Sequence, residues 1–125
     1  EKKGVDKLTF CSAQPNYTLF KDKKMLDDLD KHWIQLMYSK EKGLQKQEFW
    51  KRQYEKHGTC CLNRYNQTAY FSLALHLKEK IDLLSTLHNS GIDPGENYTF
   101  QEIAKAIKTV TNADSLFKCV KRTTQ

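Results

Sequence analysis

One twelve-residue stretch of the chain gathers the residue types that phosphoryl-transfer chemistry needs. It reads Phe49-Trp50-Lys51-Arg52-Gln53-Tyr54-Glu55-Lys56-His57-Gly58-Thr59-Cys60. In a helix, positions i, i+3, i+4 and i+7 share one face. Here those positions are Trp50, Gln53, Tyr54 and His57. Gly58 is the residue type that commonly follows a helix end, so we expect His57 at the C-terminus of this helix.

The side chains around His57 would suit a phosphodiester substrate. Imidazole gains and loses a proton near neutral pH, and Arg52 and Lys56 lie four residues apart on a basic edge of the same helix. Cations stabilise a charged phosphorane, an imidazole moves a proton, and aromatic rings pack against bases. The alternative is a helix that buries its aromatic residues and ends in a capping histidine. For an arbitrary helix, that structural interpretation is the commoner one.

The exact string closely resembles the second conserved active-site segment of the ribonuclease T2 family, usually F-W-x-H-E-W-x-K-H-G-T-C. The paired Cys60-Cys61 that follows is similar to the plant self-incompatibility ribonucleases (S-RNases), those of the nightshade family above all. The resemblance extends from Cys11 to Cys119. It implies an α+β protein with the ribonuclease T2 fold, in which helices pack on an antiparallel sheet. The present chain should be its mostly α-helical part.

The resemblance also implies a role for the side chains of this helix. His57 would be a general acid/base, acting as the base, and Lys56 would stabilise the phosphorane. Trp50 and Tyr54 would shape and support the pocket rather than bind a base directly. The implied reaction is cleavage of single-stranded RNA by its own 2′-hydroxyl, giving a 2′,3′-cyclic phosphate with little base specificity. It requires no cofactor and no metal.

Two positions depart from the family pattern. Arg52 stands where many members have a His that helps to hold phosphate, and a guanidinium can bind phosphate through its planar fork. Gln53 stands where many members have a Glu. Its amide cannot relay a proton but can donate to a non-bridging oxygen. We therefore expect Gln53 and Arg52 to contact the phosphate.

Four cysteines constrain the chain further: Cys11, Cys60, Cys61 and Cys119. They allow three full pairings. The sequence contains no Cys-x-x-Cys pair, so we do not expect a zinc site. The resemblance pairs Cys11 with Cys60, which would fix the exit of the catalytic helix and contribute about 2–4 kcal/mol. It gives Cys119 a partner outside this chain and leaves Cys61 free or buried. A Cys11–Cys61 bond remains open on the sequence alone.

Charge and sequons indicate a secreted protein. The net charge is +6 and 11% of residues are aromatic, which is compatible with RNA binding but also with cell-wall polysaccharide or anionic membranes. Sequons for N-glycosylation begin at Asn16, Asn66 and Asn97. Three of them in a short cysteine-containing chain favour the secretory route. We expect these asparagines to be exposed and the protein to be a monomer without a membrane segment. The resemblance to S-RNases implies a location in the style or pistil matrix.

The length suits one domain, which we interpret as residues 1–125 of a partial ribonuclease domain. The family carries its other catalytic His in an H-G-L-W-P segment on an upstream strand, and this chain contains no such segment. We therefore expect the upstream strand and the C-terminal strands of the sheet to be missing. The 125 residues alone should be close to inactive.

The remaining pattern predicts the supporting elements. Residues 1–20 should be a connector, 22–38 a helix, 39–46 a polar loop broken at Gly43, and 67–88 an amphipathic helix. A capping box should open another helix; its members are Thr99-Phe100-Gln101-Glu102. His32 on the first helix is more typical of a core or boundary histidine than of a catalyst.

Two segments, Ser12 to Asp27 and Tyr38 to Lys46, resemble the hypervariable regions of S-RNases. The resemblance implies allele-specific recognition there, with pollen S-locus F-box proteins as candidate partners. The simpler interpretation is two solvated loops. Two further functions stay open: a plant T2-type ribonuclease of defence or phosphate scavenging, and a catalytically idle secreted glycoprotein that acts by recognition.

Overall fold

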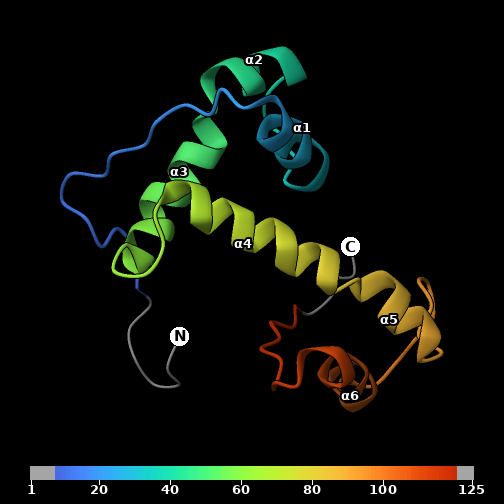
Figure 1. Ribbon diagram of the computed structural model, residues 1–125. Helices are drawn as coiled ribbons and strands as arrows, with labels where there is room; N and C mark the ends of the chain where they lie inside the picture. Colours follow the sequence, from blue (N-terminus) through green and yellow to red (C-terminus); the bar gives the residue numbers. More distant parts are fainter. Residues whose placement is uncertain (1–7, 121–125) are drawn as a thin grey trace. The chain divides into compact units, whose positions relative to one another are not determined.

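The computed structural model describes residues 8–120 of the 125-residue chain. Within this range the chain forms six α-helices and one 3-10 helix and contains no strand. It divides into two compact units, Glu1–Lys78 and Glu79–Gln125. The prediction of a mostly helical chain is therefore confirmed (Figure 1).

The first unit carries the stretch with the candidate catalytic residues. Its elements are α1 (Lys23–His32), α2 (Lys40–Lys46), α3 (Glu48–Lys56), the 3-10 helix η1 (Gly58–Cys61) and α4 (Gln67–Lys80), whose last two residues belong to the second unit. A buried cluster of Leu29, Trp50, Tyr54 and Phe71 joins α1, α3 and α4. Burial of each such side chain contributes about 1.5–3 kcal/mol.

Aromatic rings make up most of this core. The Phe71 ring lies 5.2 Å from Phe20 and 5.3 Å from both Trp33 and Tyr70, measured between centroids. Buried indole and phenol groups usually find a hydrogen-bond partner. Accordingly, the Trp50 indole N–H donates to the Trp33 carbonyl at 2.8 Å. The core thus fixes both the position and the rotation of α3.

The helix predicted over 22–38 is shorter than expected, because α1 ends at His32. Asp22 caps its start by accepting a hydrogen bond from the Met25 backbone. At its end, the Trp33 carbonyl is held by Trp50, and the chain leaves the helix there. Residues 34–38 are not helical and include a turn at 36–37, and the apolar positions that continued the helical pattern face solvent. They are Ile34, Leu36 and Met37, with 56%, 87% and 88% of their surface exposed.

The loop predicted over 39–46 is wrong, because residues Lys40–Lys46 form helix α2. Ser39 caps it through a hydrogen bond from the Lys42 backbone. Gly43 does not break this helix; it is buried, and a Cβ there would lie 2.8 Å from the Gln35 side-chain nitrogen. Close packing of Gln35, rather than chain flexibility, explains a glycine at this position.

The helix predicted over 67–88 is two helices, α4 and α5 (Leu83–Asn89). Asp82 interrupts the pattern, because its carboxylate accepts a hydrogen bond from the Ser85 backbone and caps a new helix. In the second unit, α5 packs against α6 (Phe100–Thr111). The predicted capping box of α6 is confirmed, with hydrogen bonds in both directions between Thr99 and Glu102. These bonds lower the pKa of the Glu102 carboxyl.

Gly58 follows α3 as expected, but for a different physical reason. The only glycines with positive φ among the described residues are Gly91 and Gly95, so Gly58 is not a left-handed helix cap. It is buried, and a Cβ at this position would overlap the Tyr54 ring. Glycine is therefore required for the close approach of η1 to α3.

We predict that Gly58→Ala lowers the free energy of unfolding by about 2–3 kcal/mol, because the added methyl must displace a buried ring. Denaturant titration would measure this loss. Lys51→Ala, on the exposed side of the same helix, should change stability by less than about 0.5 kcal/mol. The double variant Gly58→Ala/Tyr54→Leu should lose less stability than the sum of the losses in the two single variants, because the smaller side chain leaves room for the added methyl. Losses that simply add would contradict the steric explanation.

Candidate active site

The core sorts the side chains of α3 by exposure. Trp50 is fully buried and Tyr54 is 2% exposed, whereas Gln53 is half-buried and His57 is exposed. The four residues predicted to share one face therefore divide into a buried pair and a more accessible pair. The buried pair packs into the core beneath the helix and supports it from there.

The accessible part of α3 carries the exposed Lys51 and the two cations predicted to contact the reacting phosphate. Arg52 is exposed and Lys56 half-buried, and they lie one helical turn apart. Neither makes an ion pair with any residue in the range 8–120. By contrast, Lys23 on α1 is bonded to Asp27. The charges of α3 are thus available to an anionic ligand.

The end of α3 is fixed by hydrogen bonds to carbonyl groups that a helix terminus leaves unpaired. The His57 N–H donates to the Gln53 carbonyl at 2.9 Å, and the Thr59 hydroxyl donates to the Glu55 carbonyl at 2.8 Å. The Phe10 N–H donates to the Lys56 carbonyl at 2.7 Å. The backbone at the catalytic candidates is therefore well determined, while their side chains remain accessible.

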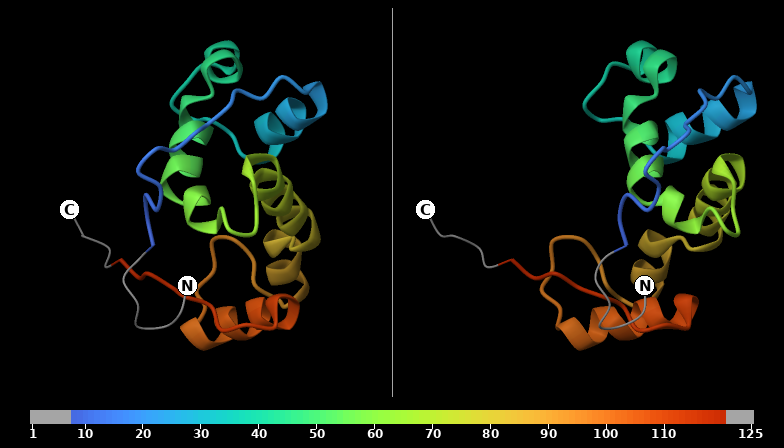
Figure 2. Two further views of the ribbon diagram at one scale, coloured as in Figure 1. Left: turned by 60° about the vertical axis from the view of Figure 1, so that its left-hand side comes forward. Right: turned by 90° about the vertical axis from the view of Figure 1, so that its left-hand side faces the viewer.

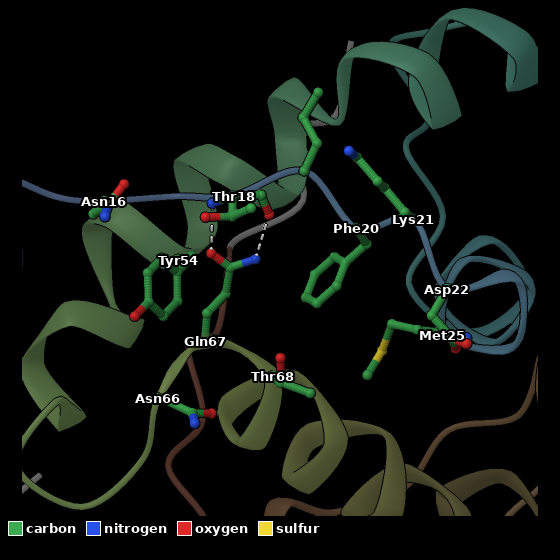
Figure 3. Close-up of a pocket in the computed structure, with 11 residues that line it drawn as sticks. Asn16, Thr18, Phe20, Lys21, Asp22, Met25, Tyr54, Asn66, Gln67 and Thr68 are labelled. Atoms are coloured by element: carbon green, nitrogen blue, oxygen red, sulfur yellow. Dashed lines mark hydrogen bonds between the residues drawn. The ribbon is translucent and has the colours of Figure 1, made fainter.

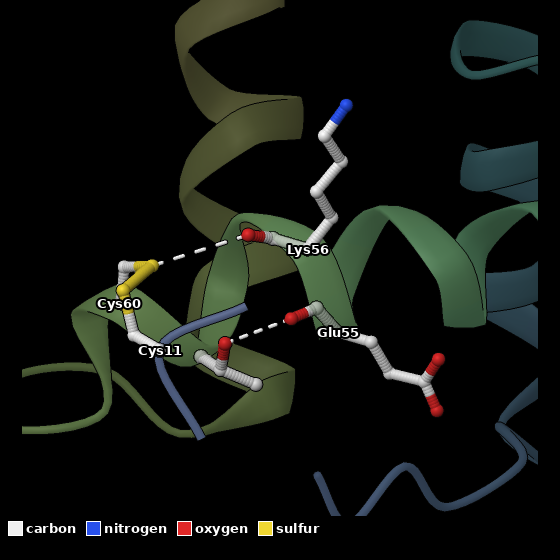
Figure 4. Close-up of a disulfide and its surroundings, with 5 residues drawn as sticks. Cys11, Glu55, Lys56 and Cys60 are labelled. Carbon is white, nitrogen blue, oxygen red and sulfur yellow. Dashed lines mark hydrogen bonds between the residues drawn. A yellow bond between two sulfur atoms is a disulfide. The ribbon is translucent and has the colours of Figure 1, made fainter. Parts of the chain in front are cut away.

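A disulfide between Cys11 and Cys60 lies next to this helix end (Figure 4). This is the pairing that the resemblance implies. Figure 4 also shows the Lys56 side chain extending away from the disulfide, so its ammonium group is not enclosed by it. Cys61 and Cys119 form no disulfide within the described residues.

An apolar hollow of about 390 Å³ adjoins Arg52. On α3 it is lined by Glu48, Phe49 and Arg52, and on the turn after α1 by Ile34, Leu36, Met37 and Tyr38. Apolar walls with a cation at the rim are suited to a planar base that is linked to a phosphate. The sequence reading missed this hollow because it placed residues 34–38 in a helix. The signal in the sequence that could have indicated the hollow is the apolar run Ile34, Leu36 and Met37, which directly precedes a polar segment.

A second hollow, of about 680 Å³, is bordered by two of the three sequon asparagines, Asn16 and Asn66 (Figure 3). Their sequons are physically joined, because the Gln67 side chain bonds the Thr18 backbone in both directions. Asn16, Asn66 and Asn97 are all exposed, as expected for glycan acceptors. Of the candidate catalytic helix, this hollow contacts only Tyr54.

The other three histidines lie on helices other than α3, His88 in the second unit. His32 ends α1 and His76 lies on α4. His88 lies on α5 and pairs with Asp93, which follows that helix. Among residues 8–120, no three His, Cys, Asp or Glu side chains gather where they could hold a metal ion. The helices described between residues 8 and 120 lack the length and apolar character of a membrane-spanning segment.

Comparison with known proteins decides the family. The family model described as "Ribonuclease T2 family" matches residues 1–125. The chain belongs to the ribonuclease T2 family. It is 54% identical to "Ribonuclease S-2" of Solanum tuberosum over 90% of this chain and 50% of that protein. It is 31% identical to "Ribonuclease 3" of Arabidopsis thaliana over 89% of this chain and 49% of that protein.

A solved relative shows the same fold. The crystal structure of the gametophytic self-incompatibility associated SF11-RNase of Nicotiana alata superposes with a TM-score of 0.81 at 52% identity. The match covers 87% of this chain and 55% of that chain. The fold is therefore the ribonuclease T2 fold. The chain spans about half the length of the curated relatives it matches.

We predict that the protein isolated under non-reducing conditions contains the Cys11–Cys60 bond. A tryptic digest should then contain the peptide with Cys11 disulfide-linked to the peptide His57–Arg64, which contains both Cys60 and Cys61. Fragmentation between these two cysteines assigns the partner, after enzymatic removal of any glycan at Asn16. Linkage of Cys11 to Cys61, or of Cys60 to Cys119, would contradict the structure.

Proposed function

We propose that the protein is a secreted endoribonuclease that cleaves single-stranded RNA through a 2′,3′-cyclic phosphate. The observation that carries this proposal is α3 itself: it exposes Arg52 and ends at the exposed His57, its Lys56 makes no ion pair within residues 8–120, and it lines an apolar hollow with Phe49 and Arg52. Membership of the ribonuclease T2 family supports it. An unpaired cationic surface next to a base-sized apolar hollow is what an RNA substrate requires.

In the proposed reaction, His57 removes the proton of the 2′-hydroxyl. The 2′-oxygen then attacks phosphorus, the bond to the 5′-oxygen breaks, and the leaving oxygen takes a proton from a general acid. Lys56 stabilises the charge of the phosphorane, while Arg52 and the Gln53 amide hold the non-bridging oxygens. Trp50 and Tyr54 support the helix from the core, and a base occupies the hollow at Phe49.

A second proton-transferring group is required, and the stretch from Phe49 to Cys60 contains no histidine other than His57. We propose that this group belongs to the remainder of a longer protein, since the matched part of this chain covers 50% and 57% of two relatives. The chain would then be one part of a single ribonuclease domain whose sheet is completed elsewhere. No cofactor enters the proposed reaction.

We further propose that the protein acts as a pistil S-RNase in gametophytic self-incompatibility. Its identity to S-named ribonucleases of Solanum and Nicotiana, 54% and 52%, exceeds its 31% identity to Ribonuclease 3 of Arabidopsis. Secretion is supported by three exposed sequons and a disulfide, and a location in the pistil matrix follows from the proposed S-RNase role. Candidate partners are RNA and pollen S-locus F-box proteins, and the proposed state is a monomer.

We predict that the whole protein cleaves RNA in the presence of a chelator, with a bell-shaped pH profile. His57→Ala should lose at least about 10³-fold in kcat/KM, because the base is removed. Lys56→Ala should lose about 10²-fold, because one cation no longer stabilises the phosphorane. An RNA cleavage assay measures both losses.

His76→Ala is the matched control, since it removes an exposed histidine from α4 outside the cationic surface. It should retain wild-type activity. Circular dichroism should show all three variants folded, because none of these side chains is fully buried. Full activity of His57→Ala would end the enzymatic assignment of α3. A folded protein without any ribonuclease activity would instead favour the recognition glycoprotein.

A further inference from the structure

Residues 10–20, which we call the brace, run alongside α3 from its C-terminal end to its N-terminal end (Figures 1 and 2). The brace is attached at both ends of the helix. At the C-terminal end, the Phe10 N–H donates to the Lys56 carbonyl, and Cys11 is bonded to Cys60. Between the two ends, the Tyr17 ring packs against the Tyr54 ring of α3, and at the N-terminal end the side chain of Gln47 makes the hydrogen bonds to the brace.

The Gln47 amide uses all of its hydrogen-bonding positions. Its oxygen accepts from the Tyr17 hydroxyl at 2.8 Å and from the Phe20 N–H at 2.9 Å. Its nitrogen donates to the Phe20 carbonyl at 2.9 Å and the Leu44 carbonyl at 3.2 Å. Burial raises the pKa of the Tyr17 hydroxyl, which stays protonated and donates. A buried amide with both oxygen lone pairs and both N–H groups used specifies a single arrangement of the groups around it.

The backbone of Gln47 is equally constrained. Its N–H donates to the Gly43 carbonyl in the last hydrogen bond of α2. Its carbonyl accepts from the Lys51 N–H in the first hydrogen bond of α3. Its φ of 52° lies in the left-handed region, and the same value occurs at Phe10. Non-glycine residues adopt this conformation rarely and keep it only where surrounding contacts impose it. Both attachment points of the brace are thus held against a local backbone preference.

We propose that Gln47 is a positioning residue for RNA cleavage, because it holds the N-terminal turn of α3 against the brace. The inference rests on the proposed function. Gln47 is 2% exposed and does not line the hollow at Arg52, so it acts through the helix and not on the substrate. The turn that it fixes carries Phe49 and precedes Arg52, whereas the brace fixes Lys56 at the other end. Reacting groups displaced by about 1 Å can lose about 10²-fold in rate.

Gln67 provides a matched control. Its amide pairs with the same brace in the same manner, accepting from the Thr18 N–H at 2.8 Å and donating to the Thr18 carbonyl at 2.6 Å (Figure 3). It attaches the brace to the start of α4 and not to α3. Removal of this amide therefore loosens the brace but leaves the catalytic helix anchored.

The test compares Gln47→Leu and Gln67→Leu in the whole protein, at a temperature where circular dichroism shows both folded. For Gln47→Leu we expect kcat to fall about 10- to 100-fold while KM changes less than about twofold. For Gln67→Leu we expect both constants within about twofold of wild type.

Gln47→Glu adds a signature that a general loss of stability would not give. A protonated carboxyl keeps the acceptor oxygen and one of the two donors of the amide. A carboxylate has no donor and places a second acceptor oxygen opposite the Phe20 and Leu44 carbonyls. Burial raises the pKa of the introduced carboxyl. The ratio of the Gln47→Glu kcat to the wild-type kcat should therefore rise as the pH falls towards about 5 and decrease as the pH rises towards about 8. The corresponding ratio for Gln47→Leu should not change with pH.

Wild-type kcat in folded Gln47→Leu would overturn the proposal, as would an equal loss in Gln67→Leu. A wild-type protein that cleaves no RNA would end the proposed function but still leave a decisive readout. Amide hydrogen exchange over residues 51–54 should be faster in Gln47→Leu than in Gln67→Leu. Equal rates in the two variants would show that Gln47 does not hold α3.

Discussion

Burial of Trp50 and Tyr54 is the constraint on which the candidate site depends. The two rings lie one turn apart on α3 and are buried in the aromatic core of the first unit, where the Trp50 indole is also hydrogen-bonded to the Trp33 carbonyl. A helix with two such side chains on one side has a single favourable rotation about its axis. Arg52 and Lys56 then necessarily face away from the core. The apolar pattern of the sequence, rather than any contact among the polar residues, places the cationic surface in solvent.

A buried face sets the rotation of a helix but leaves its ends free to fray. In this protein both ends of α3 are fixed by other parts of the chain. Gly58 permits η1 to pack directly on the Tyr54 ring, and the disulfide joins η1 to Cys11. At the opposite end, Gln47 connects the helix to residues 17–20. The outcome is a rigid support for exposed side chains, which is the arrangement that phosphoryl-transfer chemistry favours.

Much of this arrangement could be predicted from the sequence, because the underlying signals are local. The helix ending at His57 and the capping box at Thr99 depend on neighbouring residues in the chain. The errors arose where distant contacts decide. The apolar pattern runs on beyond His32, yet the hydrogen bond from Trp50 to Trp33, seventeen residues apart, accompanies the end of α1. Likewise, Gln47 reads as an ordinary polar residue before a helix, and nothing near it in the sequence indicates that residues 17–20 will bury it.

The central claim is that α3 presents a phosphate-binding surface beside a base-binding hollow. The most direct test is a crystal structure of the whole protein with a dinucleotide that lacks the attacking 2′-hydroxyl and so cannot be cleaved. Our account predicts the phosphate within hydrogen-bond distance of Arg52 and Lys56, with His57 facing the 2′-position and a base against Phe49. A phosphate bound away from α3, with these side chains contacting only solvent, would contradict it.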